Sequence, residues 1–161
     1  MISVQVTKNY QGIEVPVHRL RKLITALCNR FALHEATISI AIVDDIQIRR
    51  LNKRFLNRSV STDCLSFDLS EYQDTESDRT FEVVVNGELA QKEARSRGHP
   101  SEAELALYVT HGMLHNLGFD DATEAEAKKM HETENEILQQ FGYGPVYDRQ
   151  TKTQRQNGTQ I

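Results

Sequence analysis

Two histidines and an aspartate lie close together in one short stretch of the sequence. His111 and His115 are four residues apart, and Asp121 follows after a glycine, Gly118. On a helix, side chains at i and i+4 share a face, so both imidazoles can point at one metal ion. A glycine can turn the backbone sharply and return the carboxylate of Asp121 to the same point. The spacing therefore predicts a site for one divalent ion, with zinc expected.

The same residues allow two other interpretations. Zinc peptidases with ligands at this spacing place a catalytic glutamate directly after the first histidine, and this position is Gly112 here. A peptidase would therefore lack its proton acceptor. In the second interpretation no metal binds, because His111 is a hydrogen-bonded histidine of the core and Asp120 or Asp121 only caps the last helix. The spacing by itself leaves both open.

A second candidate for chemistry is a group of cations in the first half of the chain: Arg49, Arg50, Lys53, Arg54 and Arg58. Arg50, Arg54 and Arg58 follow the spacing i, i+4, i+8 and would form one stripe if the helix continues that far. Guanidinium groups match phosphate oxygens, so the stripe is a predicted RNA-binding surface, with a solvated helix face as the alternative. Phe55 is expected in the core rather than stacked on bases.

Charge is unevenly distributed along the chain, which has a net charge of −4. Residues 1–60 carry a net +6 and residues 61–161 a net −10. The overall acidity argues against bulk attraction to nucleic acid, and no DNA partner is expected.

No apolar run approaches the roughly 20 residues of a membrane helix, and no signal pattern is present, so a cytoplasmic protein without a membrane partner is expected. Cys28 and Cys64 are predicted to be buried free thiols.

These residues need a scaffold of strands and helices to position them. Alternating and β-branched patterns predict four strands: Ile2–Thr7, Ala36–Val43, Cys64–Leu69 and Phe81–Val85. Helical periodicity and capping residues predict five helices: Val15–Phe31, Asp45–Phe55 capped by Asp44, Leu89–Arg97, a long one capped by Ser101 with Glu104, and one from Thr123 with Glu126 to about Phe141. The predicted fold is an α/β (α+β) domain over residues 1–147, with a mixed sheet and the metal site at the end of the long central helix. Residues 148–161 are predicted to be a disordered polar tail.

Four segments of the chain are similar, in order, to motifs of one protein family. Residues 51–67 (LNKRFLNRSVSTDCLSF) resemble L-N-x-x-Y-R-x-x-D-x-P-T-D-V-L-S-F, and residues 82–85 (EVVV) resemble the strand G-D-I-V-I. Residues 92–100 (KEARSRGHP) resemble the helix and turn that precede the metal helix, and residues 111–121 (HGMLHNLGFDD) resemble H-G-x-L-H-L-x-G-Y-D-H. These are motifs of the YbeY family, bacterial rRNA maturation factors described as metal-dependent single-strand endoribonucleases. The resemblance covers about residues 37–143.

This resemblance implies a metal-dependent hydrolase that cleaves single-stranded RNA in rRNA processing and ribosome biogenesis. It implies one zinc ion on His111, His115 and Asp121, with rRNA and the small ribosomal subunit as partners. Zinc would lower the pKa of a bound water toward about 7, although an RNA 2′-hydroxyl is an alternative nucleophile. Three polar residues are expected to shape the loop and strand that face the site, or to be purely structural: Thr62, Asp63 and Ser66.

Three positions depart from the family's motifs. Asp121 replaces the third metal histidine, and its oxygen favours harder ions. Leu56 replaces an arginine thought to contact substrate phosphate, and Arg54 and Arg58, two residues to either side, are the predicted catalytic substitutes. Phe-Glu at 81–82 replaces Gly-Asp. Two alternative functions follow: a weakly active or non-catalytic ribosome-assembly or RNA-binding factor with a structural metal, and a metallohydrolase of another substrate.

Overall fold

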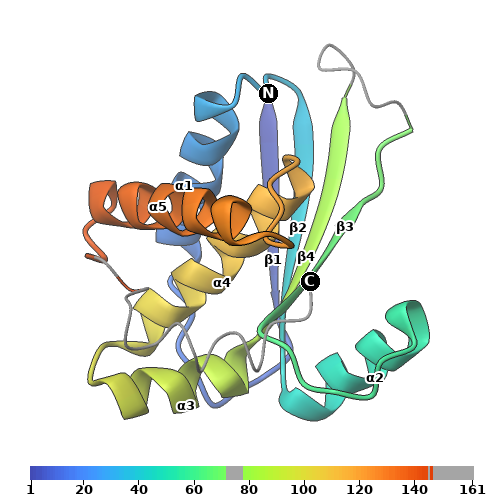
Figure 1. Cartoon of the computed structure of the whole chain (residues 1–161), viewed down its shortest axis with the longest axis vertical. Helices are drawn as coiled ribbons and strands as arrows, with labels where there is room; N and C mark the ends of the chain where they lie inside the picture. The colour runs from blue at the N-terminus through green and yellow to red at the C-terminus, as the bar shows by residue number, and fades with distance from the viewer. Residues whose placement is uncertain (72–77, 145, 147–161) are drawn as a thin grey trace.

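A four-stranded mixed sheet in the order β1-β2-β4-β3 forms the centre of the computed structural model, which describes residues 1–71, 78–144 and 146 (Figure 1). Its strands are β1 (Ile2–Lys8), β2 (Ala36–Val43), β3 (Cys64–Asp68) and β4 (Arg79–Asn86). β1, β2 and β4 are parallel, whereas β3 pairs with β4 in the antiparallel direction. The predicted polar tail lies outside the described residues.

Five helices surround the sheet in the described part of the chain: α1 (Val17–Arg30), α2 (Asp45–Leu56), α3 (Gly87–Arg97), α4 (Ser101–Asn116) and α5 (Glu124–Gln140). The α/β class, the mixed sheet and the number of elements are therefore as the sequence predicted. None of the described helices combines the length and the apolar character that a membrane crossing requires.

The two faces of the sheet pack against different helices. Successive side chains of a strand point to opposite faces. Ile40 and Val83 belong to the main core with residues of α1, α4 and α5. Val43 and Val84 point the other way and pack on Ile48 of α2 in a second, smaller cluster. Figure 1 shows α2 standing apart from the other helices, so α2 and α4 lie on opposite faces of the sheet.

Helix α4 is the central helix, and every residue from 103 to 114 is buried. A helix that is apolar all round is expected where neighbours cover every side. Gly112 allows α4 to pack closely on the sheet. A Cβ at this position would lie only 2.6 Å from Cγ1 of Val83, so a larger residue would hold the helix further away. This approach places the C-terminal turns of α4, and hence His111, directly over the sheet.

Two of the three predicted helix caps are confirmed. The side chain of Asp44 accepts from the backbone N–H of Gln47 at 2.8 Å, and Thr123 accepts from Glu126 at 3.1 Å. The cap predicted at Ser101 is wrong, because Pro100 occupies the N-cap position and no side chain caps α4. Glu104 is instead fully buried and pairs with Arg97 of α3, so its carboxylate balances a buried guanidinium rather than closing a capping box.

The structure also corrects two predictions about α2. Phe55 is not a core residue: it is 55% exposed, its ring meets Phe67 edge-on at 5.5 Å, and the guanidinium of Arg54 lies 5.3 Å from its centroid. The stripe of three arginines is interrupted, because α2 ends at Leu56 and Asn57 adopts a left-handed conformation with φ 55°. Arg58 therefore lies in the segment after the helix.

Both cysteines are expected to resist thiol reagents in the folded protein. Cys28 and Cys64 are buried free thiols, as predicted, and burial raises the pKa of Cys28 to about 11. Because the thiolate is the reactive form, neither should react with Ellman's reagent at pH 8 until the chain is unfolded, when both should react. Rapid modification of one equivalent in native protein would contradict this placement.

Candidate metal centre

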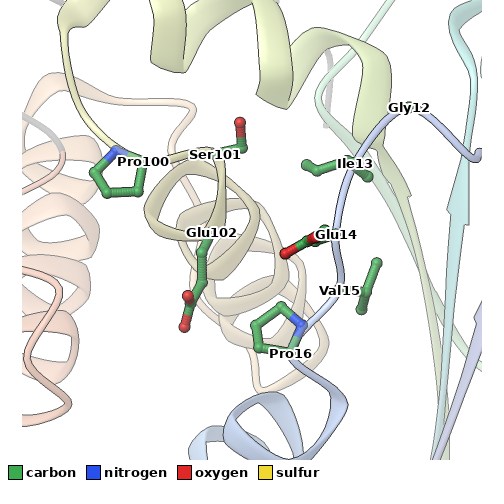
Figure 2. Close-up of a pocket in the computed structure, with 8 residues that line it drawn as sticks. All are labelled: Gly12, Ile13, Glu14, Val15, Pro16, Pro100, Ser101 and Glu102. Atoms are coloured by element: carbon green, nitrogen blue, oxygen red, sulfur yellow. The ribbon is translucent and has the colours of Figure 1, made fainter.

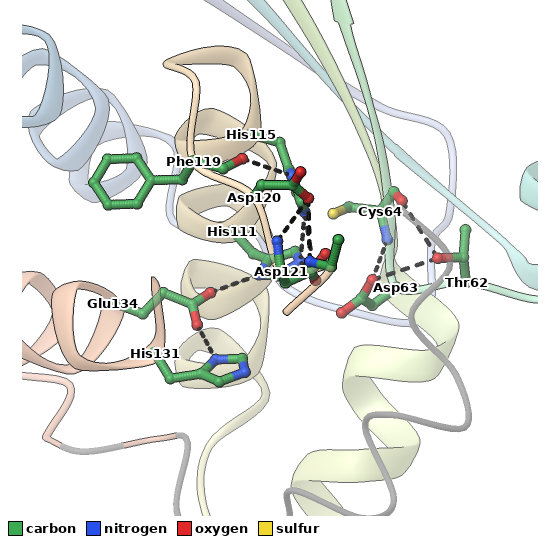
Figure 3. Close-up of polar contacts among 11 residues, drawn as sticks. Thr62, Asp63, Cys64, His111, His115, Phe119, Asp120, Asp121, His131 and Glu134 are labelled. Atoms are coloured by element: carbon green, nitrogen blue, oxygen red, sulfur yellow. Dashed lines mark hydrogen bonds and ion pairs between the residues drawn. The ribbon is translucent and has the colours of Figure 1, made fainter. Parts of the chain in front are cut away.

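Helix α4 and the turn after it bring three potential ligands together (Figure 3). The Nε2 atoms of His111 and His115 lie 3.2 Å apart, and Oδ2 of Asp121 lies 3.9 and 3.8 Å from them. All three ligand atoms fall within 4.8 Å of one another. Two ligands about 2.0 Å from a tetrahedral zinc ion lie about 3.3 Å apart, so the group fits one ion and leaves a fourth position open.

The turn that returns Asp121 begins at the end of α4. The backbone N–H of Phe119 donates to the carbonyl of Leu114 at 2.9 Å, and Gly118 adopts φ 99°, a conformation that favours glycine. Oδ1 of Asp120 accepts from the backbone N–H groups of Asp121 and Ala122 at 2.7 and 3.3 Å. Asp120 therefore orders the loop backbone that carries the third ligand, whereas the N-cap of α5 is Thr123.

Each histidine is held through its second ring nitrogen. Nδ1 of His115 lies 3.2 Å from the carbonyl oxygen of Phe119, and Nδ1 of His111 lies 2.8 Å from Oε2 of Glu134. Donation through Nδ1 leaves the Nε2 lone pairs facing the metal position. Burial lowers the pKa of His115 below its ordinary value, and the His111 ring lowers it further, so the neutral, metal-binding form is favoured.

Two residues of this network were not identified from the sequence. Glu134 is fully buried on α5, and its second oxygen lies 2.7 Å from Nδ1 of His131, as Figure 3 shows. The available signal was the position of Glu134 on the face of α5 that also buries Met130 and Ile137. A carboxylate at an apolar position of a helix needs a polar partner, but the periodicity does not name that partner.

The polar residues before β3 order their own backbone. Oδ1 of Asp63 accepts from the backbone N–H of Cys64 at 2.8 Å and is 3.5 Å from the hydroxyl of Thr62. Thr62 and Asp63 are buried, whereas Ser66 is partly exposed on β3. These contacts give the pair the loop-shaping role that the sequence suggested, next to the strand that packs on α4.

The arginines predicted to bind RNA lie elsewhere. Arg50 and Arg54 are exposed on α2, on the face of the sheet opposite α4, so the fold does not place them on the face that carries the histidines. Arg58 is exposed in the segment that leads from α2 back to β3. Their roles stay predictions.

A cavity of about 420 Å³ opens at the other end of α4 (Figure 2). Residues 12–16 and 100–102 line it, and the carboxylate of Glu102 also contacts Arg19 and the hydroxyl of Tyr143. Ser101 and His111 are ten residues apart, or about 15 Å along a helix. The cavity is therefore separate from the three potential metal ligands, His111, His115 and Asp121.

The chain is similar in sequence to known proteins of one family. The sequence model of the family described as Endoribonuclease YbeY matches residues 5–142. The chain is 33% identical over 142 residues to "Endoribonuclease YbeY" of Caldanaerobacter subterraneus subsp. tengcongensis, covering 81% of this chain and 89% of that protein. It is 30% identical to the protein of the same name from Syntrophotalea carbinolica, covering 86% and 95%.

A solved structure supports the fold. The solution structure of TM1509 from Thermotoga maritima matches with a TM-score of 0.58 and 22% identity, covering 98% of this chain and 93% of that one. The sequence matches over most of the chain decide its family. This chain belongs to the family of the endoribonuclease YbeY.

Proposed function

We propose that this protein is a metal-dependent endoribonuclease that cleaves single-stranded RNA, with one zinc ion held by His111, His115 and Asp121. The observation that carries the proposal is the convergence of these three ligand atoms in a chain whose relatives are named endoribonucleases. Its substrate is proposed to be rRNA at the small ribosomal subunit, in the cytoplasm. Family membership and the absence of a membrane-spanning helix among the described residues support that setting.

The residues of the chain prepare a site with an open coordination position. A bound divalent ion would supply Lewis acidity toward a phosphodiester and a water molecule of lowered pKa. His111 and His115 provide neutral nitrogen ligands, and Asp121 adds one negative charge, which weakens the Lewis acidity of the ion relative to three histidines. The side chain of Asp121 is 26% exposed, so this ligand borders solvent, whereas His111 is buried.

The packing at Gly112 argues against a peptidase of the zinc type. Its general base would have to stand at Gly112, but this position faces Val83 of the sheet, where even a Cβ would lie at 2.6 Å. A glutamate there would therefore be directed into the core, not toward the water on the metal. Substrate chemistry that needs no side-chain base at this position remains compatible with the fold.

The direct test is an RNA cleavage assay with and without chelator. Purified protein should cut a single-stranded RNA, leave a duplex of the same sequence intact, lose activity in EDTA and regain it when zinc is added. The His115→Ala variant, prepared in the same way, controls for contaminating nucleases. Cleavage that persists both in EDTA and in this variant would reject the metal-dependent mechanism.

RNA binding is proposed to use Arg50, Arg54 and Arg58. Arg54 lies over the exposed ring of Phe55, and an aromatic ring beside arginine suits a stacked base and its phosphate. Because the net charge of residues 1–60 is +6, this part of the chain is the one suited to an anionic ligand.

Replacing each of these three arginines with alanine should weaken single-stranded RNA binding and reduce the slope of log K against log salt by about one. For Arg50→Ala and Arg54→Ala, KM should rise more than kcat falls, because both residues lie on α2, on the face of the sheet opposite α4. Fluorescence anisotropy at several salt concentrations measures both quantities. Arg49→Ala is the matched control, since Arg49 is paired with Asp45 at 2.6 Å. Unchanged affinity and slope in all three variants would remove α2 from the RNA-binding surface.

A further inference from the structure

The carboxylate of Glu134 contacts two histidines, His111 and His131, and of these two His111 is a potential metal ligand. Its Oε2 lies 2.8 Å from Nδ1 of His111 and its Oε1 lies 2.7 Å from Nδ1 of His131. Glu134 is 0% exposed. The two imidazole rings are nearly parallel, at 12°, with centroids 6.4 Å apart. The carboxylate is thus held on both sides, and a buried carboxylate needs such partners.

We propose that His131 and Glu134 are positioning residues that hold His111 for metal binding, so that His131 controls metal affinity without being a ligand. This inference rests on the proposed function only in taking His111 as a metal ligand. A carboxylate that accepts from Nδ1 fixes the ring orientation and tautomer and makes Nε2 a better donor to the ion. His115 is held by the backbone carbonyl of Phe119, so Glu134 is the side chain that tunes a ligand in this way.

The role of His131 follows from the geometry of the carboxylate. If only His111 bound Glu134, the carboxylate could rotate about its last bond and change the direction of its oxygen. His131 stands three residues before Glu134 on α5 and donates to the other oxygen, so one helical turn fixes that rotation. The side chain of His131 is 17% exposed, so most of it is buried and a test variant at this position must keep the volume of the ring.

Four variants separate this role from a purely structural one. Glu134→Gln leaves one oxygen for two donors, and His131→Phe keeps the ring but removes the donor. His131→Gln restores an N–H donor, and Glu132→Gln makes the same chemical change as Glu134→Gln at an exposed position of α5. The measurements are the Zn²⁺ dissociation constant by chelator competition, the visible spectrum of Co²⁺-loaded protein and the melting temperature without metal.

Glu134→Gln and His131→Phe should raise the Zn²⁺ dissociation constant about 10–100-fold and shift the Co²⁺ bands. His131→Gln should recover most of the affinity, and Glu132→Gln should match wild type. Wild-type affinity and an unshifted spectrum in His131→Phe would overturn the proposal. This test does not depend on whether Glu134→Gln folds. Wild-type protein that binds neither ion would refute the metal site itself and, with it, the proposed function. Tight binding in every variant would refute only the positioning role.

Discussion

Replacing His115 with alanine is expected to abolish stoichiometric zinc binding and to lower RNA cleavage by more than about 100-fold. Residues that only support a metal ligand cost about 10–100-fold when they are changed, so a direct ligand should cost more. His115 supplies one of three nitrogen and oxygen atoms that lie within 4.8 Å of one another. Without it, two ligands remain, which is fewer than catalytic zinc sites use.

Metal content of protein purified without added zinc and single-turnover cleavage rates measure these effects. His111→Ala and Asp121→Ala should lose the ion as well. His18→Ala, an exposed histidine of α1, is the matched control and should retain both properties. If zinc remained stoichiometric in both His111→Ala and Asp121→Ala, the three-ligand site would have to be abandoned.

Replacing Gly112 with glutamate is expected to prevent stable folding. The Cβ alone would lie 2.6 Å from Cγ1 of Val83 and 3.6 Å from Sγ of Cys64, and Val83 is a stiff side chain of the central strand β4. The rest of the glutamate would bury a carboxylate among apolar groups, which costs several kcal/mol or more. Since domains of this size have stabilities of about 5–15 kcal/mol, the combined loss can exceed what the fold retains.

Gly112→Ala isolates the steric part of this effect. Overpacking costs about 1–3 kcal/mol, whereas replacing glycine by alanine inside a helix gains up to about 1 kcal/mol. We therefore expect a net loss of about 1 kcal/mol in the free energy of unfolding, measured with urea. Val83→Ala should make room for the new methyl group. The double variant should therefore lose less free energy of unfolding than the sum of the losses in the two single variants. Strict additivity would show that Val83 is not the obstacle.

The elements and the metal ligands could be predicted because their signals are local. The β-branched composition of Ala36–Val43 and the helical spacing of the apolar residues in α1 depend only on neighbours in the sequence. His111, His115 and Asp121 span one helical segment and one glycine turn, so backbone geometry alone brings their ligand atoms together. Even the cap at Asp44 was predictable, since it involves residues three apart.

What the sequence could not determine are the contacts between elements. The exposure of Phe55 depends on how far α2 extends over the sheet, and Glu104 lost its predicted capping role because folding brings Arg97 of α3 to it. Glu134 reaches His111 across 23 positions of the chain, through the packing of α5 on α4.

The sequence by itself therefore determined the strands, the helices and the three potential metal ligands. Only the tertiary structure decided that a buried carboxylate held by His131 contacts a ligand, that Gly112 packs against the sheet, and that the basic helix α2 lies on the opposite face. The physical reason is that turns and helices are set by torsion angles of neighbouring residues, whereas burial and pairing are set by which surfaces meet when the chain is folded.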